Sequence, residues 1–186
     1  MRDRLDVVNV IQWALDSAAA GAKPVMHHEL LWNDGLMVAL FDGPSPPGRS
    51  DFHINTSPEL FYQVRGELIS RVHEGGKFRD LLIGEGEMFL IPPQIPHLNI
   101  RTEGSVGLVI HRSRAADATE AIVWYCEQCS HELYREEYVH EDVQRQVPAF
   151  IDAFHHHEER RTCSQCGTVK PVPAEVVQRC HGSSVR

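Results

Sequence analysis

A series of short apolar runs between about residues 25 and 112 constrains the fold more than any other feature of the chain. Glycine and proline turns separate the runs, as in GPSPPG at 43–48 and GEG at 84–86. The clearest runs are 35–41, 59–66, 80–84, 86–92 and 106–110. Many short strands at this spacing predict an all-β sandwich or barrel.

Both ends of the chain carry helical patterns instead. Residues 3–20 are predicted to form an amphipathic helix capped by Asp3. Its apolar face would carry Leu5, Val8, Ile11 and Leu15. A second helical stretch is expected toward the C-terminus, with Val143, Val147, Phe150 and Phe154 on one face.

Length and charge bound the class of protein. The chain has 186 residues, 42% of them hydrophobic, and a net charge of −8. An acidic chain is a poor partner for nucleic acid or an anionic membrane, because binding phosphate needs a basic face. There is no secretory pattern and no apolar run of membrane-spanning length. We therefore expect a cytoplasmic protein with one main domain and a tail.

Two histidines and a glutamate form the candidate metal site. Side chains alternate between the faces of a strand, so His53 and Asn55 should share a face, as should His97, Asn99 and Arg101. In a closed barrel that face is the interior. Two imidazoles meeting the Glu59 carboxylate there would form a facial triad suited to non-heme Fe(II) and O2. A single strand histidine is more often packed or solvated, so the prediction rests on the joint pattern.

That joint pattern resembles the two cupin motifs. His53, Glu59 and Gly66 match the first motif, and Gly86, Pro92 and His97 match the second. Asn55 stands where many cupins have another histidine, which favours three metal ligands over four. The resemblance implies a jelly-roll barrel, the double-stranded β-helix, with an N-terminal helix.

A more specific resemblance extends over residues 5–170. The segments of the chain that carry it are residues 49–53, 59–63, 65–67, 86–92, 96–97, 106–110 and 124–126. Together they resemble 3-hydroxyanthranilate 3,4-dioxygenase. The resemblance implies that His53, Glu59 and His97 ligate Fe(II). It also implies that Arg49 and Arg101 bind the carboxylate of a small aromatic acid, whose ring O2 then opens.

The chain departs from this family at His111, where the family has a glutamate. An imidazole accepts or donates a proton near neutral pH, so His111 is the candidate catalytic and substrate-contacting residue. It would not offer an amino group the same charge, and a differently substituted ring such as 4-amino-3-hydroxybenzoate is the alternative substrate. Alternatively His111 is a hydrogen-bonded core residue. A non-catalytic cupin that binds an aromatic acid and a metal-dependent isomerase are further alternatives.

The four cysteines of two CxxC pairs predict a second metal centre. Cys126 and Cys129 form one pair, and Cys163 and Cys166 the other. Two such pairs can close a tetrahedral site around iron or zinc, with no open position for catalysis. We expect it to tie a tail, residues 116–186, to a barrel domain, residues 1–115, in a homodimer. His155–His157 are interpreted as a solvated helix end, and no role is assigned to His27 and His28.

Overall fold

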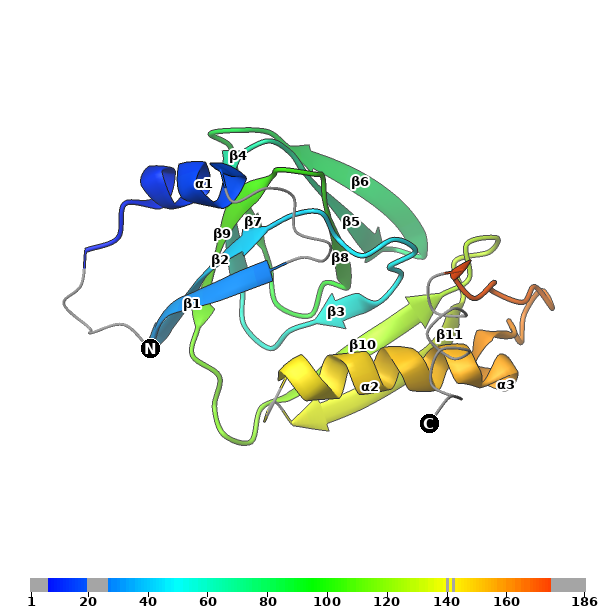
Figure 1. Cartoon of the computed structure of the whole chain (residues 1–186). Helices are drawn as coiled ribbons and strands as arrows, with labels where there is room; N and C mark the ends of the chain where they lie inside the picture. The colour runs from blue at the N-terminus through cyan, green and yellow to red at the C-terminus, as the bar shows by residue number, and fades with distance from the viewer. Residues whose placement is uncertain (1–6, 20–26, 140, 142, 175–186) are drawn as a thin grey trace, which may run out of the picture.

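The computed structural model describes residues 7–19, 27–139, 141 and 143–174. Eleven strands dominate it, with one helix before them and two after them (Figure 1). The elements are α1 (Val10–Ala19), β1 (His27–Asp34), β2 (Leu36–Asp42), β3 (Phe52–Ile54), β4 (Glu59–Arg65), β5 (Leu68–Glu74), β6 (Lys77–Ile83), β7 (Met88–Ile91), β8 (His97–Arg101), β9 (Val106–Arg112), β10 (Thr119–Tyr125), β11 (Glu132–Val139), α2 (Val143–His156) and α3 (Glu158–Arg161).

The strands form two antiparallel sheets that face each other. One sheet has the order β1-β2-β9-β4-β7 and the other the order β11-β10-β3-β8-β5-β6. The chain crosses between the sheets several times, so residues distant in sequence meet in the space between them. This is the cupin barrel, and the prediction of an all-β fold with an N-terminal helix is confirmed. All five apolar runs became strands.

The five-stranded sheet has two differently used faces. Ala39, Phe61 and Val109 line the interior, whereas their neighbours Leu40 and Val106 pack beneath α1. Strand alternation produces this division, because successive side chains point to opposite faces. The sheet therefore buries apolar residues on both sides, and its inner face is available for a site.

Helix α1 differs from the prediction in its start and in its buried face. Asn9 caps it by accepting the backbone N–H of Gln12 at 3.0 Å, while the predicted cap Asp3 and Leu5 lie outside the described residues. Ile11 and Leu15 are each 54% exposed, and Ala14 is buried instead. The predicted face was wrong at Ile11 and Leu15, because the sheet packs against the stripe containing Ala14 and Trp13, whereas Val8 packs against the same cluster as predicted.

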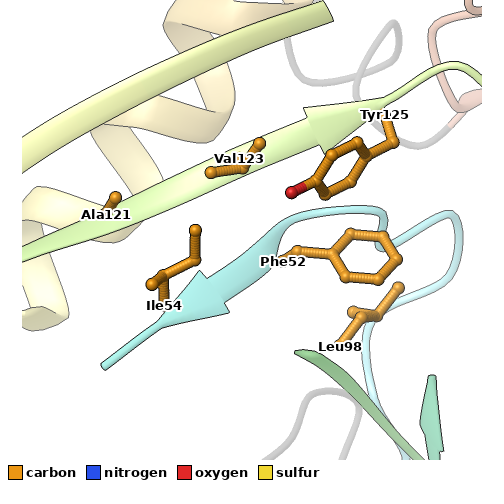
Figure 2. Packing of buried hydrophobic residues seen from close by; sticks show 6 residues of the cluster. All are labelled: Phe52, Ile54, Leu98, Ala121, Val123 and Tyr125. Carbon is orange, nitrogen blue, oxygen red and sulfur yellow. The ribbon is translucent and has the colours of Figure 1, made fainter. Parts of the chain in front are cut away.

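The six-stranded sheet carries a second apolar cluster around β3. Phe52 and Ile54 pack with Leu98, Val123 and Tyr125 (Figure 2). The rings of Phe52 and Tyr125 meet edge to face, with centroids 5.2 Å apart. His53 lies between Phe52 and Ile54 in sequence and lines the cavity. Packing on one face of β3 thereby fixes which residue of this short strand faces the interior.

Helix α2 packs against β10 and β11, as Figure 1 shows. The rings of Trp124 and Phe154 stack with centroids 4.4 Å apart, and Val147 and Phe150 pack around them. The expected apolar face is confirmed at Val147, Phe150 and Phe154. The side chain of Val143, the fourth residue of that face, is not among those that the structure describes. Strand β11 was not expected from the sequence.

The boundary expected at residue 115 falls just before β10. This strand pairs with β3, with Ile122 opposite His53, so the segment after the boundary contributes to the same sheet as the candidate ligand. Among the described residues, no helix has the length and apolar character needed to cross a bilayer.

Candidate active site and metal centres

The two sheets enclose a cavity of about 770 Å³. All six barrel residues singled out from the sequence line it, namely Arg49, His53, Glu59, His97, Arg101 and His111. Its volume is in the range of small-molecule sites and leaves room for a substituted benzene ring beside Glu59. Val147 and Pro148 of α2 also line it, so the helix forms part of its wall.

Glu59 and His97 meet across the barrel from opposite sheets. Nε2 of His97 lies 3.1 Å from Oε2 of Glu59, and both residues are buried. Nδ1 of His97 lies 3.0 Å from the carbonyl oxygen of Ile95, which favours the tautomer with the proton on Nδ1. The contact between Nε2 and Oε2 is satisfied by a cation between the two atoms, either a proton that Nε2 donates or a metal ion that both atoms ligate. A backbone carbonyl on Nδ1 is how a metal-ligating histidine is usually held.

Burial of Glu59 opposes its ionisation, but the hydrogen bond and charge of His97 outweigh that effect. The pKa of Glu59 is consequently lowered. The carboxylate is therefore available as an anionic ligand at neutral pH.

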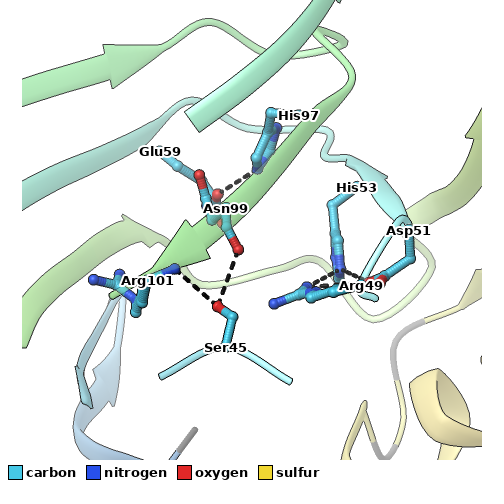
Figure 3. A network of polar contacts seen from close by, with 8 residues as sticks. All are labelled: Ser45, Arg49, Asp51, His53, Glu59, His97, Asn99 and Arg101. Atoms are coloured by element: carbon cyan, nitrogen blue, oxygen red, sulfur yellow. Dashed lines mark hydrogen bonds and ion pairs between the residues drawn. The ribbon is translucent and has the colours of Figure 1, made fainter. Parts of the chain in front are cut away.

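His53 stands opposite His97 in the pairing of β3 and β8. Its Nε2 lies 3.0 Å from Nη2 of Arg49 and 3.1 Å from Oδ2 of Asp51 (Figure 3). The His53 and His97 ring centroids are 6.4 Å apart. Binding of a metal by His53 would compete with its contacts to Asp51 and Arg49. Two imidazoles and one carboxylate are the donor types of a facial triad. Among the described residues, however, only the cysteine group has all its ligand atoms within 4.8 Å of one another, so His53, Glu59 and His97 are less closely gathered.

Asp51 was missed from the sequence, although it has the same strand phase as Arg49 and His53. Burial opposes its ionisation, but the charge of Arg49 and the hydrogen bond to His53 prevail, so its pKa is strongly lowered. Nη2 of Arg49 lies 3.1 Å from Oδ2 of Asp51. Asp51 thus orients Arg49 and His53 together.

Arg101 is a buried guanidinium without a carboxylate partner among the described residues. It is 4% exposed, and its Nη1 donates to Oε1 of Gln63 at a long 3.4 Å. Burial and the nearby charge of Arg49 lower its pKa to about 10, although the buried Asp42 carboxylate acts in the opposite direction, and the group is still charged at pH 7. A buried cation in this state favours an incoming anion.

Gly107 makes room for this guanidinium. A Cβ at Gly107 would lie 2.6 Å from Nη1 of Arg101 and 2.8 Å from Oε1 of Gln63. Any side chain here would force Arg101 to move. Sequence reasoning missed Gly107, because its neighbour in space comes from another strand.

His111 stands opposite Glu59 in the pairing of β4 and β9. Its Nδ1 lies 2.7 Å from the carbonyl oxygen of Arg112, and its Nε2 lies 3.0 Å from Nη1 of Arg114. Burial and the charge of Arg114 lower the pKa of His111, so the imidazole is neutral at pH 7 and its Nε2 accepts from Arg114.

Arg114 lies in the stretch between β9 and β10, where no sequence pattern indicated a cavity residue. Its Nε donates to Oε1 of Glu120 at 2.6 Å, and the Glu120 side chain is almost fully buried. The pair fixes Arg114 against His111 and places a third arginine on the cavity wall.

The four cysteines come together as predicted. Their sulfur atoms all lie within 4.8 Å of one another, and among the described residues this is the one group of potential ligands so close. Sγ of Cys126 lies 3.6 Å from Sγ of Cys166, and Sγ of Cys129 lies 3.5 Å from Sγ of Cys163. Sulfurs around a tetrahedral ion with bonds of about 2.3 Å are separated by about 3.8 Å. The spacing therefore fits one metal ion.

Both CxxC turns have the same backbone structure. The carbonyl of Cys126 accepts the N–H of Ser130, and the carbonyl of Cys163 accepts the N–H of Gly167. Ser130 and Gly167 both have positive φ, at 61° and 74°. Ser130 and Gly167 therefore occupy equivalent positions in the two turns. Two equivalent turns present the four sulfurs as a preformed cage.

The interpretation of the histidine run as solvated was wrong for its first member. His155 is buried against the Phe154 ring, and burial lowers its pKa. Its place on the packed face of α2 explains this, since Phe154 and His155 both turn toward the sheet. His156 and His157 are exposed. The side chains of His27 and His28 lie outside the described residues.

The two facing sheets and the cavity between them define a cupin barrel. A family model described as 3-hydroxyanthranilic acid dioxygenase matches residues 3–155. The chain belongs to the 3-hydroxyanthranilic acid dioxygenase family, and it is an enzyme of the dioxygenase class.

Three relatives with the name 3-hydroxyanthranilate 3,4-dioxygenase span most of the chain. The protein from Xanthomonas campestris pv. campestris (strain 8004) is 38% identical over 81% of this chain and 85% of its own. The Neurospora crassa protein is 36% identical over 91% of this chain and 94% of its own. The Bacillus cereus protein is 34% identical over 94% of this chain and 97% of its own.

Proposed function

We propose that this protein is an Fe(II)-dependent ring-cleaving dioxygenase that acts with O2 on 3-hydroxyanthranilate or a close analogue. The observation that carries the proposal is the buried, carboxylate-free guanidinium of Arg101 in the same cavity as the Glu59–His97 pair. One group is suited to an anionic substituent and the other to a metal cation. A small aromatic acid with a ring hydroxyl would use both, and the family membership agrees.

His53, Glu59 and His97 would hold the iron. When bound, the iron would act as a Lewis acid toward the ring hydroxyl and bring O2 next to the ring. The chain contributes the ligand geometry: Glu59 comes from one sheet and the two histidines from the other, so the rigid barrel fixes all three.

Arg101 and Arg49 would bind the substrate carboxylate. A guanidinium presents a planar fork of donors to a carboxylate, and the desolvated setting strengthens the attraction. Asp51 already holds Arg49 at 3.1 Å, so Arg49 contributes as a positioned donor and Arg101 as the uncompensated charge. Together they would orient the ring so that its hydroxyl faces Glu59 and His97.

His111 would accept the proton of the ring hydroxyl at Nε2. The imidazole is neutral because burial and Arg114 lower its pKa, and a neutral imidazole has a lone pair to offer. Proton transfer would require Nη1 of Arg114 to leave Nε2, while Nε of Arg114 stays on Glu120.

A ring with the amino group elsewhere, such as 4-amino-3-hydroxybenzoate, is a second candidate substrate. The observation in its favour is that the wall at His111 offers a neutral imidazole and a cation in place of the family glutamate. His111→Glu should shift the ratio of turnover rates toward 3-hydroxyanthranilate, as measured across a panel of aminohydroxybenzoates. Identical relative rates in both proteins would remove His111 as the residue that distinguishes these rings.

The central experiment is oxygen uptake by the Fe(II)-loaded protein with 3-hydroxyanthranilate. We expect consumption of O2 together with loss of the aromatic absorbance, and neither change without O2. Substrate conversion that persists anaerobically would contradict the dioxygenase and favour an isomerase. Binding without any turnover would favour a non-catalytic cupin.

The cysteine site would carry a structural iron or zinc ion, because all four positions are filled by sulfur. We also propose a homodimer. Metal analysis of the purified protein would identify the ion, and light scattering would give the molar mass in solution. A monomer at micromolar concentration would contradict the dimer.

A further inference from the structure

Asn99 carries a buried polar atom that the proposed chemistry does not yet use. Its Oδ1 is shielded from solvent and has no hydrogen-bond partner, and the residue lines the cavity. A buried acceptor without a donor is destabilising and uncommon in folded proteins. A ligand group that supplies an N–H or O–H would satisfy it.

The position of Asn99 along β8 is informative. It lies midway between His97 and Arg101, and the three alternate residues all line the cavity. Leu98 and Ile100 lie in the apolar cluster on the other face. In Figure 3, Asn99 lies between the Glu59–His97 pair and Arg101. Its amide therefore lies between the proposed metal end and the proposed carboxylate end of the cavity.

The backbone at Asn99 is firmly held. Its carbonyl oxygen accepts a hydrogen bond from Oγ of Ser45 at 3.4 Å, and the same Oγ accepts the Arg101 N–H at 2.9 Å. Asn99 also stands opposite Ser70 in the pairing of β5 and β8. A side chain on such a strand is better placed for recognition than one on a loop.

Neighbouring acceptors on the cavity wall already have partners. Oε1 of Gln63 accepts from Arg101, and Nε2 of His111 lies 3.0 Å from Arg114 Nη1. Oε2 of Glu59 contacts His97. Oδ1 of Asn99, in contrast, is buried without any hydrogen-bond partner.

We propose that Oδ1 of Asn99 accepts an N–H of the substrate's ring amino group, and thereby selects rings whose amino group lies between the carboxylate and the hydroxyl. The inference rests on the proposed function. If Arg101 holds the carboxylate and the Glu59–His97 end receives the hydroxyl, the ring position between them lies beside Asn99. Position 111 supplies no carboxylate, so Asn99 takes over recognition of the amino group.

The test compares ligands with and without that amino group. Dissociation constants of 3-hydroxyanthranilate, 3-hydroxybenzoate and 4-amino-3-hydroxybenzoate are measured by anaerobic titration of the Fe(II)-loaded protein. Asn99→Ala should weaken 3-hydroxyanthranilate about three- to tenfold, the effect of one neutral hydrogen bond, and leave the other two ligands unchanged. Asn99→Asp retains an acceptor and should keep the preference for 3-hydroxyanthranilate.

Asn55→Ala is the matched control, because Asn55 also lines the cavity, two residues after His53. It should leave the ratio of the three constants as in the wild type. Equal changes for all three ligands in Asn99→Ala would overturn the inference, because the lost affinity would then not depend on the ring amino group. If this variant does not fold, Asn99→Leu gives the same readout.

The proposed function fails separately from the inference. A wild-type protein that shows no O2-dependent loss of 3-hydroxyanthranilate would overturn the function, and the inference with it. A wild-type protein that turns over 3-hydroxyanthranilate while Asn99→Ala keeps the wild-type ratio would overturn the inference alone.

Discussion

Replacement of Arg101 by methionine should weaken substrate binding strongly without destabilising the substrate-free protein. Arg101 makes no direct ion pair with a carboxylate among the described residues, so its removal costs the folded protein only the longer-range attraction to Asp42. Loss of one partner of a buried charge pair costs about 2–5 kcal/mol. Because about 1.4 kcal/mol is a factor of ten, the Kd of 3-hydroxyanthranilate should rise about 30- to 4,000-fold.

The free energy of unfolding of the substrate-free Arg101→Met variant should rise rather than fall. A pKa of about 10 for Arg101, against an ordinary value of about 12.5, corresponds to about 3 kcal/mol against the charged form. The Phe41 ring, whose centroid lies 5.4 Å from the guanidinium carbon, offsets about 1 kcal/mol of this cost by a cation–π interaction. The long hydrogen bond to Gln63 offsets a further part of the cost. Methionine fills a similar apolar volume, so we expect a net gain of about 1 kcal/mol in the free energy of unfolding.

Urea unfolding without substrate measures the stability, and anaerobic titration of the Fe(II)-loaded protein measures the Kd. Arg71→Met is the matched control, since Arg71 forms a surface pair with Asp80 at 2.7 Å. It should change stability by less than about 1 kcal/mol and leave the Kd unaltered. An unchanged Kd in Arg101→Met would mean that the carboxylate binds elsewhere. A loss of several kcal/mol in stability would mean that the guanidinium is a structural group.

Two further predictions test the rest of the site. Gly107→Ala should raise the Kd of 3-hydroxyanthranilate about 10- to 100-fold, because its Cβ would lie 2.6 Å from Arg101 Nη1. Gly84→Ala is the control and should leave the Kd unchanged, since its Cβ would have its nearest contact with Glu87 at 3.4 Å. Equal effects of the two substitutions would refute the steric argument. His97→Ala should lose the barrel iron and keep the metal of the cysteine site, whereas Cys163→Ser should lose the latter and lower the melting temperature. Metal analysis of both variants decides, and retention of the barrel iron in His97→Ala would refute the ligand assignment.

Much of the barrel could be predicted because it depends on local pattern. Alternation along a strand decides which residues share a face, and turn residues decide where strands end. His97, Asn99 and Arg101 could therefore be assigned to one face before any fold was known. The CxxC spacing is equally local, since each turn presents its two sulfurs by itself. The buried face of α1 could not be predicted, because a short helix with apolar residues on several sides takes its orientation from the sheet it meets.

The sequence by itself determined the strand phase of the candidate ligands, the four-sulfur cage and the family. Only the tertiary structure decided what each polar group faces. Asp51 beside Arg49 is an exception, a local contact that their shared phase already indicated. Arg114 meets His111 through a folded connector, and Gly107 lies against Arg101 of another strand; no local pattern encodes these two contacts. The same holds for the uncompensated charge of Arg101 and the unpaired oxygen of Asn99. Whether a buried polar group lacks a partner depends on every chain segment around it, and those segments come together only when the barrel closes.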